Sequence, residues 1–254
     1  MPAGSTPAGD AQHDPTPFDY DTDPGRYRLG MRLSRSFATA SLHAAISEVL
    51  LDAGARSVLD VGCGHGPLRA ALPEHAALAA RAARPDGGPP WLVGLDASRR
   101  MLLDHPAPVV QADALALPLV DRSFDAVVAV NTLDHLPDPR VALREARRVL
   151  APGGLLLAAA ISRDDAPELA PVWRPCPSPF DAEDAPALVA SVFGAVEVRR
   201  WDAPLVTLPD PQAVRDFLVA RFVDPLAAAD AAQGVRTPLT VTKRGALVLA
   251  RAGY

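Results

Sequence analysis

The chain has 254 residues, of which 49% are apolar, and it carries a formal net charge of −5 at pH 7. This length allows one large domain or two small ones, and the apolar share is enough for a sizeable buried core. Its Arg and Lys residues are scattered, whereas phosphate binding needs a concentrated positive face, so we expect no nucleic-acid partner.

The N-terminal part of the chain divides into a tail and a helical cap. Residues 1–17 are rich in Pro, Gly, Ala and Thr, which is typical of disordered segments. They lack the basic and apolar regions of a secretory signal, and no apolar run of the chain is long enough to span a bilayer. We therefore expect a cytoplasmic protein with no membrane partner. Apolar residues recur at helical spacing over 30–53 and predict a helical cap within 18–55.

Strands and helices then alternate over 56–162. The expected strands are 57–61, 91–95, 108–111, 124–130 and 155–161, and the expected helices are 67–83, 98–104 and 138–150. Short apolar strands that alternate with helices are typical of a mostly parallel sheet covered on both faces. We therefore predict a doubly wound, Rossmann-like α/β sheet.

The tail over 163–254 is less regular. Helices are expected at 181–192 and 212–222, and strands at 195–202 and within 239–250. We interpret this tail as an insertion and closing strands of the same unit, so that 18–254 form a single domain with 56–162 as its ligand-binding core.

A glycine-rich turn at residues 58–66 (VLDVGCGHG) carries the main functional signal. A strand that contains Asp60 opens into Gly62, Gly64 and Gly66. Glycines let the backbone bend tightly and approach a ligand, and the helix that follows offers unpaired N–H groups to an anion. The dinucleotide fingerprint Gly-x-Gly-x-x-Gly/Ala does not match, because its sixth position is Pro67. This disfavours, but does not exclude, a nicotinamide oxidoreductase.

Acidic residues also follow the next two strands. Asp96 ends the second strand, and its carboxylate can accept hydrogen bonds from both hydroxyls of a ribose. Asp113 ends the third strand. Together with Asp60, these acids fall on the carboxyl edge of one sheet, where open α/β folds bind ligands. Each acid alone could be a solvated strand end, but their order favours a binding site.

These motifs resemble those of the class I S-adenosylmethionine (SAM)-dependent methyltransferases. The Gly-x-Gly-x-Gly turn with an acid two positions before it is similar to motif I of that family. Residues 131–136 (NTLDHL) are similar to the family's segment beside the sulfonium and acceptor, and residues 148–155 (RVLAPGGL) to its stop before the fifth strand. The resemblance covers 56–161 closely and reaches 22–27 and 241–245 more loosely. It implies that the last strand runs antiparallel to the others.

The resemblance implies SAM as cofactor and S-adenosylhomocysteine as product. In the family, the acid at the position of Asp113 accepts from the adenine amino group, and the next residue's N–H bonds the ring. The cofactor-binding residues expected here are Asp60, Gly62, Cys63, Gly64, Gly66, Asp96, Ala97, Met101, Asp113, Ala114, Asn131 and Thr132. The reaction expected is methyl transfer to an O, N or C atom of a small-molecule acceptor that the motifs do not identify.

Two residues after the fourth strand are candidate catalytic bases. His135 lies beside the expected methyl position, and its imidazole titrates near neutrality. Asp134 is the second candidate. For both residues a packing role is the alternative. Two further functional readings stay open: SAM cyclisation or cleavage on the same fold, and a homologue without catalysis.

Other residues of the sequence are candidates for a lid, an acceptor pocket or a metal site. Tyr20, Tyr27 and Arg28 stand where such enzymes carry a lid, although a surface role is an alternative for Arg28. Five aromatic residues of the tail can line an acceptor pocket or belong to the core: Trp173, Phe180, Trp201, Phe217 and Phe222. The histidines show no ligand spacing and the two cysteines form no Cys-x-x-Cys pair, so we predict no metal site and no disulfide framework.

Overall fold

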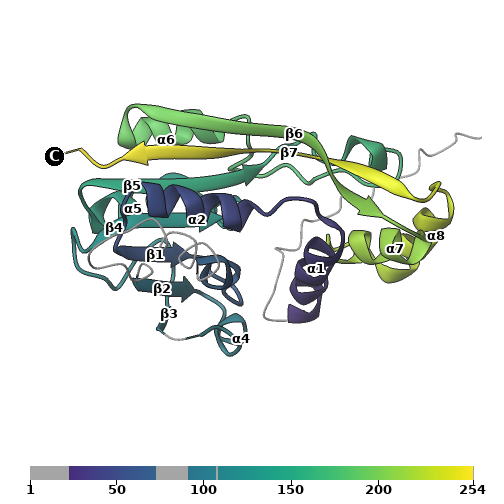
Figure 1. Ribbon diagram of the computed structural model, residues 1–254, viewed down its shortest axis with the longest axis horizontal. Coiled ribbons are helices and arrows are strands. Elements are labelled where there is room, and N and C mark those ends of the chain that lie inside the picture. The colour runs from purple at the N-terminus through teal and green to yellow at the C-terminus, as the bar shows by residue number, and fades with distance from the viewer. Residues whose placement is uncertain (1–22, 73–90, 107, 254) are drawn as a thin grey trace, which may run out of the picture.

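The computed structural model describes residues 23–72, 91–106 and 108–253. Seven strands form one sheet in the order β3-β2-β1-β4-β5-β7-β6 (Figure 1). They are β1 (Ser57–Val61), β2 (Trp91–Asp96), β3 (Val109–Gln111), β4 (Phe124–Val130), β5 (Leu150–Ile161), β6 (Val196–Leu208) and β7 (Leu239–Arg251). Strands β1 to β5 pair in parallel, whereas β7 pairs antiparallel with β5 and with β6. The predicted Rossmann-like sheet with an antiparallel last strand is confirmed.

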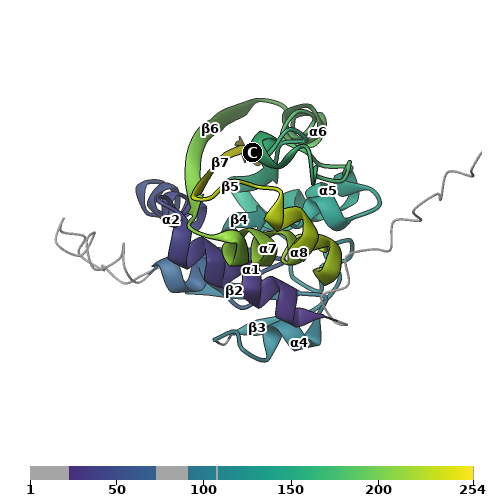
Figure 2. The ribbon, with the colours of Figure 1, turned by 90° about the vertical axis from the view of Figure 1, so that its right-hand side faces the viewer.

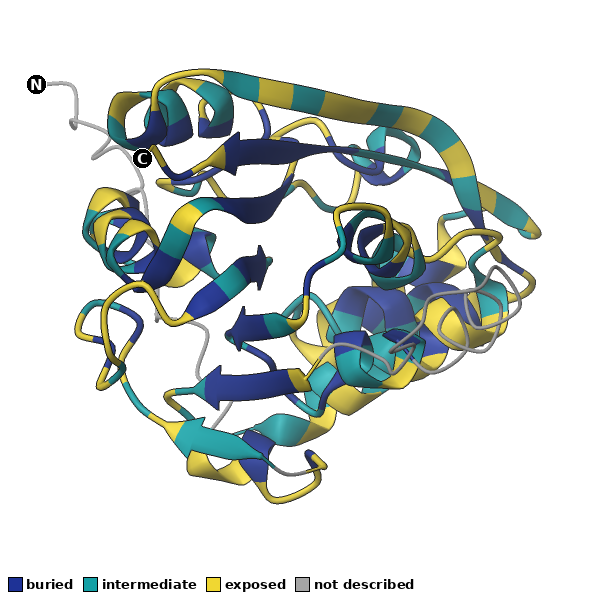
Figure 3. Ribbon diagram, turned by 60° about the vertical axis from the view of Figure 1, so that its left-hand side comes forward, coloured by how far each residue is buried: buried dark blue, intermediate teal, exposed yellow. Residues whose placement is uncertain are grey.

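Side chains of alternate residues in the central strands pack into two hydrophobic cores, one on each face of the sheet. Leu59 of β1 packs in the core that contains α5 (Pro139–Val149) and α6 (Ala185–Phe193). Its neighbour Val58 packs in the core that contains α2 (Leu42–Asp52) and residues 67–72, which are also helical. Figure 3 shows these central strands as buried, whereas the edge strand β6 alternates between half-buried and exposed residues. The helices on both faces explain why the strands are apolar on both sides.

A third core lies beyond the carboxyl ends of the parallel strands. It joins α1 (Pro24–Phe37), α7 (Pro211–Val219) and α8 (Pro225–Gln233) to the far end of the long β6–β7 ribbon. Figures 1 and 2 show these three helices covering the end of the sheet where β1, β2 and β4 stop. A ligand site at that edge is therefore enclosed by the two terminal parts of the chain.

Several predicted elements have different bounds in the structure. The helical pattern over 30–53 is divided into α1 and α2, because Ala38 forms a bridge with Val206 and Ser41 caps α2 by accepting from Ala44 N. The expected break at 152–154 was wrong, since α5 runs directly into β5. Of the helix expected at 67–83, only residues 67–72 lie in the described part, and the expected disordered tail lies outside it.

The remaining helices are short. The helix expected at 98–104 is confirmed as α4 (Arg99–Leu102), with Ser98 accepting from Met101 N at 3.2 Å. Single 3-10 turns, η2 (Leu133–His135) and η3 (Pro167–Leu169), follow β4 and β5, while α8 was not predicted. None of the helices in the described part of the chain combines the length and the apolar character that membrane crossing requires.

Candidate functional site

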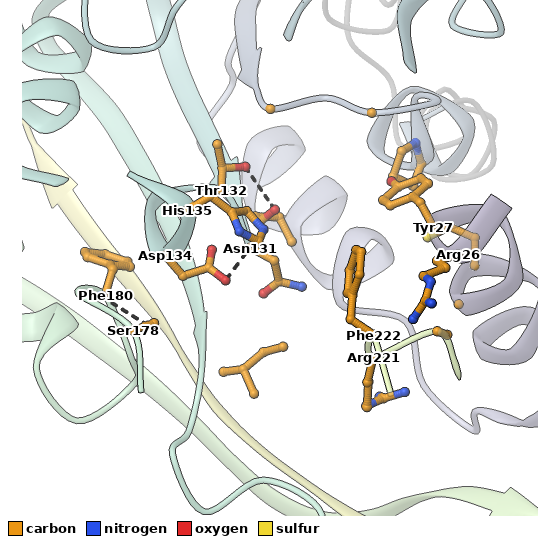
Figure 4. A pocket seen from close by; sticks show the side chains of 18 of the residues that line it. Arg26, Tyr27, Asn131, Thr132, Asp134, His135, Ser178, Phe180, Arg221 and Phe222 are labelled. Atoms are coloured by element: carbon orange, nitrogen blue, oxygen red, sulfur yellow. Dashed lines mark hydrogen bonds and ion pairs between the residues drawn. The ribbon is translucent and has the colours of Figure 1, made fainter. Parts of the chain in front are cut away.

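A cavity of about 640 Å³ opens at the carboxyl edge of the sheet. Its floor is made by the ends of β1 to β4, and its cover by α1, the segment after β5, α7 and one residue of β7. Figure 4 shows two groups of residues that face each other across this cavity. On one side lie Asn131, Thr132, Asp134 and His135, and on the other lie Arg26, Tyr27, Arg221 and Phe222.

The predicted site residues are almost all gathered in this one cavity. Those that line it are Asp60, Gly62, Cys63, Gly64, Asp96, Ala97, Met101, Asp113, Ala114, Asn131, Thr132, Asp134 and His135. Gly66 is not among the described lining residues. A Cβ at Gly66 would lie 2.9 Å from the ring of His105, so the missing side chain there makes room for this imidazole.

The glycine turn is held in place by the strands beside it. The amides of Gly62 and Cys63 donate to the Leu95 carbonyl at 2.7 and 3.0 Å, and Gly64 N donates to Asp96 Oδ2 at 2.9 Å. Gly62 and Gly64 have φ angles of +70° and +53°, which residues with a Cβ adopt only with strain. A Cβ on Gly64 would also lie 2.6 Å from the Tyr27 hydroxyl, so α1 packs directly on this turn.

Asp96 is fixed in an orientation that leaves it free to bind a diol. Oδ1 accepts from Ser98 N and Oδ2 from Gly64 N, both at 2.9 Å. Each carboxylate oxygen can accept two hydrogen bonds, so one acceptor site remains on each oxygen. Two adjacent acceptor sites at the cavity wall match the two hydroxyls of a ribose.

Asp113 is placed one strand further along the same edge. It is exposed, and its Oδ1 accepts from Leu115 N at 2.8 Å. The second carboxylate oxygen is therefore available for a donor in the cavity. The spacing along the sheet puts Asp96 between Asp60 and Asp113, because β2 lies between β1 and β3.

Asp60 lies at the end of β1 and is almost fully buried, with 4% of its surface exposed. Burial, assisted by the nearby charge of Asp96, raises its pKa to about 8. Burial also raises the pKa of the Cys63 thiol, because its thiolate would lie beside Asp60 and Asp96. Cys63 therefore remains a protonated, small side chain of the turn, which does not suit a nucleophile.

The segment after β4 turns sharply into the cavity. Asn131 has a left-handed φ of 50°, and Thr132 Oγ1 lies 3.1 Å from the carbonyl oxygens of Val61 and Val130. His135 Nε2 lies 3.8 Å from Asp134 Oδ2. The Asp134 Oδ1 atom is buried without a hydrogen-bond partner among the described residues, and this burial raises the pKa of the carboxyl. The pair is suited to take up a proton at the cavity wall.

Of the lid residues expected from the sequence, Tyr27 and Arg28 lie in the described part of the chain, and only Tyr27 lines the cavity. Tyr27 lines the cavity, and its ring meets the His65 ring edge-on with centroids 5.2 Å apart. Arg28 instead forms an exposed ion pair with Asp104 at 2.6 Å, so the surface alternative is confirmed.

Four of the five aromatic residues weighed for the acceptor pocket line the cavity: Trp173, Phe180, Phe217 and Phe222. The fifth, Trp201, lies opposite Gly245 in the β6–β7 pair and packs against the core under α2. Sequence reasoning missed four cations that line the cavity, namely Arg26, Arg163, Arg221 and Lys243. No spacing pattern marks them, since they come from separate elements of both terminal parts of the chain.

The fold and the site have counterparts among known proteins. A family model described as "Methyltransferase domain" matches residues 59–158, the part that carries the glycine turn and the three acids. Residues 59–158 are therefore similar to methyltransferase domains, and this match does not reach either terminal part of the chain.

Curated relatives are moderately similar over part of their length. A ubiquinone/menaquinone biosynthesis C-methyltransferase from Nitrobacter hamburgensis is 32% identical over 164 residues, which are 64% of this chain and 63% of that protein. A demethylmenaquinone methyltransferase from Lactiplantibacillus plantarum is 34% identical over 128 residues, or 46% of this chain and 50% of that protein. The chain thus matches less than two thirds of the length of either relative.

Solved structures share the fold at low sequence identity. A SAM-dependent methyltransferase from Thermotoga maritima, described as a possible histamine N-methyltransferase, superposes with a TM-score of 0.57 at 19% identity and covers 92% of this chain and 98% of that one. A protein described as a [4+2]-cyclase gives a TM-score of 0.56 at 19% identity, covering 92% and 95%. These likenesses concern the fold alone.

The raised pKa of Asp60 predicts a pH-dependent stability. Between about pH 4 and pH 8 the folded protein holds a proton that the unfolded chain has lost, so the free energy of unfolding should fall as the pH rises, by at most about 1.4 kcal/mol per pH unit. Asp60→Asn should remove this slope. Urea unfolding at a series of pH values measures it, with the exposed Asp202→Asn as control. Equal slopes in wild type and Asp60→Asn would contradict the assignment.

Proposed function

We propose that this chain transfers the methyl group of SAM to an oxygen, nitrogen or carbon atom of a small-molecule acceptor. The observation that supports this most directly is the Asp96 carboxylate, which two backbone amides hold at the cavity edge with one acceptor site left on each oxygen. Beside it on the same edge lies the glycine turn, in which Gly62, Gly64 and Gly66 all have positive φ angles.

The residues present fit SAM in three places. Asp96 would hold the ribose diol, and Asp113 Oδ2 would accept from the adenine amino group, while the amide of Ala114 would bond the ring. Asp60 would lie near the charged amino-acid end, where an ammonium group would favour its ionised form. When bound, SAM would supply a methyl group on a positively charged sulfur. An acceptor atom would take this methyl group by in-line displacement, and the neutral thioether S-adenosylhomocysteine would be the leaving group.

The protein's own contribution is placement, exclusion of water and proton handling. Tyr27 packs over Gly64, and the aromatic residues of the cover close the acceptor side, so the reacting atoms would be held together away from bulk water. If the acceptor must lose a proton, the His135 imidazole would take it, and the Asp134 carboxylate 3.8 Å away would stabilise the resulting cation.

The acceptor itself is proposed only by class. The curated relatives named above act, by their names, on quinone precursors, and a ring of this kind suits the aromatic lining of the cavity. The [4+2]-cyclase neighbour keeps open the use of this fold for chemistry without methyl transfer. The product formed from SAM separates the two alternatives.

Loss of the Asp96 carboxylate should weaken cofactor binding. We expect Asp96→Ala to reduce the affinity for S-adenosylhomocysteine by about 1.5–3 kcal/mol, the scale of hydrogen bonds to a charged group. Isothermal titration calorimetry measures this, and Asp202→Ala, an exposed acid outside the cavity, is the control. In the wild type, ligand at a hundred times its dissociation constant should add about 2.7 kcal/mol to the free energy of unfolding. An unchanged affinity in Asp96→Ala would mean that other groups bind the ribose.

His135 should matter for turnover rather than for cofactor binding. With an acceptor that loses a proton, His135→Ala and His135→Gln should lower kcat by about 10²–10⁴-fold while the affinity for S-adenosylhomocysteine stays nearly the same. Mass spectrometry identifies the products. A small loss of kcat would assign His135 to packing, and methylthioadenosine in place of S-adenosylhomocysteine would refute methyl transfer.

A further inference from the structure

Charge is divided between the two sides of the cavity. The acids at the ends of β1, β2 and β3 line the side assigned to SAM. The Arg and Lys side chains that line the cavity among the described residues all come from its cover or from β7: Arg26, Arg163, Arg221 and Lys243. Two lining acids of the cover, Asp165 and Asp181, pair with Lys243 and Arg163, so the lining of the cover carries more positive than negative charges.

Lys243 is largely enclosed, with 18% of its side chain exposed. Its ammonium pairs with Asp165, which is 1% exposed and whose Oδ1 accepts from Arg244 N at 2.8 Å. Asp165 is the hydrogen-bond partner of Lys243 among the described residues. An ammonium has three N–H donors, so two of them are left for a molecule in the cavity.

The surroundings of Lys243 leave its charge incompletely balanced. The Glu168 carboxylate is already hydrogen-bonded to Thr242. It accepts from the Thr242 backbone N at 2.9 Å and from the Thr242 hydroxyl. Burial, together with the positive charge of Arg221, lowers the pKa of Lys243 to about 8, whereas Asp165 and Glu168 act in the opposite direction. An additional anionic oxygen at the ammonium would fill the open donors and favour the charged form.

The walls around this ammonium are aromatic. The Lys243 Nζ atom lies 6.0 Å from the centre of the Phe217 ring, and the Arg221 guanidinium lies 3.3 Å from the same centre and 5.6 Å from that of Trp173. The Arg26 guanidinium lies 5.2 Å from the centre of the Phe222 ring, on the same side of the cavity as Arg221 (Figure 4). Flat apolar surfaces of this kind suit a planar apolar molecule, with cations placed to meet a charged substituent.

We propose that Lys243 determines the specificity of the acceptor site, and that the acceptor is a planar, apolar small molecule with one anionic oxygen group, a carboxylate or a phenolate, held by this ammonium. The inference rests on the proposed function, which assigns the opposite side of the cavity to SAM.

The test uses 2-naphthoate and its neutral isostere 2-naphthamide as probes, on protein saturated with S-adenosylhomocysteine. Calorimetry should show naphthoate binding about 10- to 100-fold more tightly than naphthamide, the scale of a hydrogen bond between charged groups. Lys243 is the only lysine of the chain, so lysine labelled with ¹³C at Cε gives one NMR signal. Its pKa should rise by about one unit or more with naphthoate and stay unchanged with naphthamide.

Variants locate the effect at Lys243. In Lys243→Met the preference for naphthoate should be lost, and the double variant with Asp165→Asn removes both charges, so that no buried carboxylate is left unpaired if the single variant folds poorly. Arg199→Met removes an exposed cation on β6, outside the cavity, and should keep the preference.

The outcomes separate this inference from the proposed function. Equal affinities for the two probes, no binding of either at millimolar concentration, or an unchanged Lys243 pKa would overturn the anionic acceptor while S-adenosylhomocysteine still binds. Failure of S-adenosylhomocysteine to bind, measured first and without the probes, would instead contradict the proposed function.

Discussion

The glycine turn after β1 is the constraint on which the rest of the site depends. Its amides bind the end of β2 through Leu95 O and Asp96, and Thr132, from the segment after β4, hydrogen-bonds the last residue of β1. Three strands are thereby locked together at their carboxyl ends. Because Asp96 is oriented by the same turn, the geometry of the proposed ribose site follows from the backbone conformation of Gly62 and Gly64 and not from a flexible side chain.

The donor and acceptor sides of the cavity have separate origins in the chain. The donor side comes from the ends of β1 to β4, which lie within the segment that matches the methyltransferase family model, residues 59–158. The acceptor side is built mostly from α1, α7, the segment after β5 and Lys243 of β7, which lie outside it. The family match therefore covers the proposed donor side, whereas the cover, which the match does not reach, would contact the acceptor.

The parts of the fold predicted correctly are those fixed by local chemistry. Strand β4 was predicted with its observed bounds, because a short two-sided apolar run has few alternatives. The positions of Asp96 and Asp113 at the cavity edge also agree with the sequence pattern, in which an acid stands at the end of a strand. Long-range pairing decided the rest. The break between α1 and α2 depends on the Ala38–Val206 bridge, and the exposure of Lys243 to the cavity depends on the register of β7 against β6. No local pattern contains either contact.

The central claim is that the edge of the sheet beside the glycine turn holds SAM. A crystal structure of the protein with S-adenosylhomocysteine tests it most directly. The account predicts both ribose hydroxyls within hydrogen-bonding distance of the Asp96 carboxylate oxygens, the adenine amino group at Asp113, and the sulfur facing His135. A ligand bound elsewhere, or a ribose held by other groups with Asp96 turned to solvent, would contradict it.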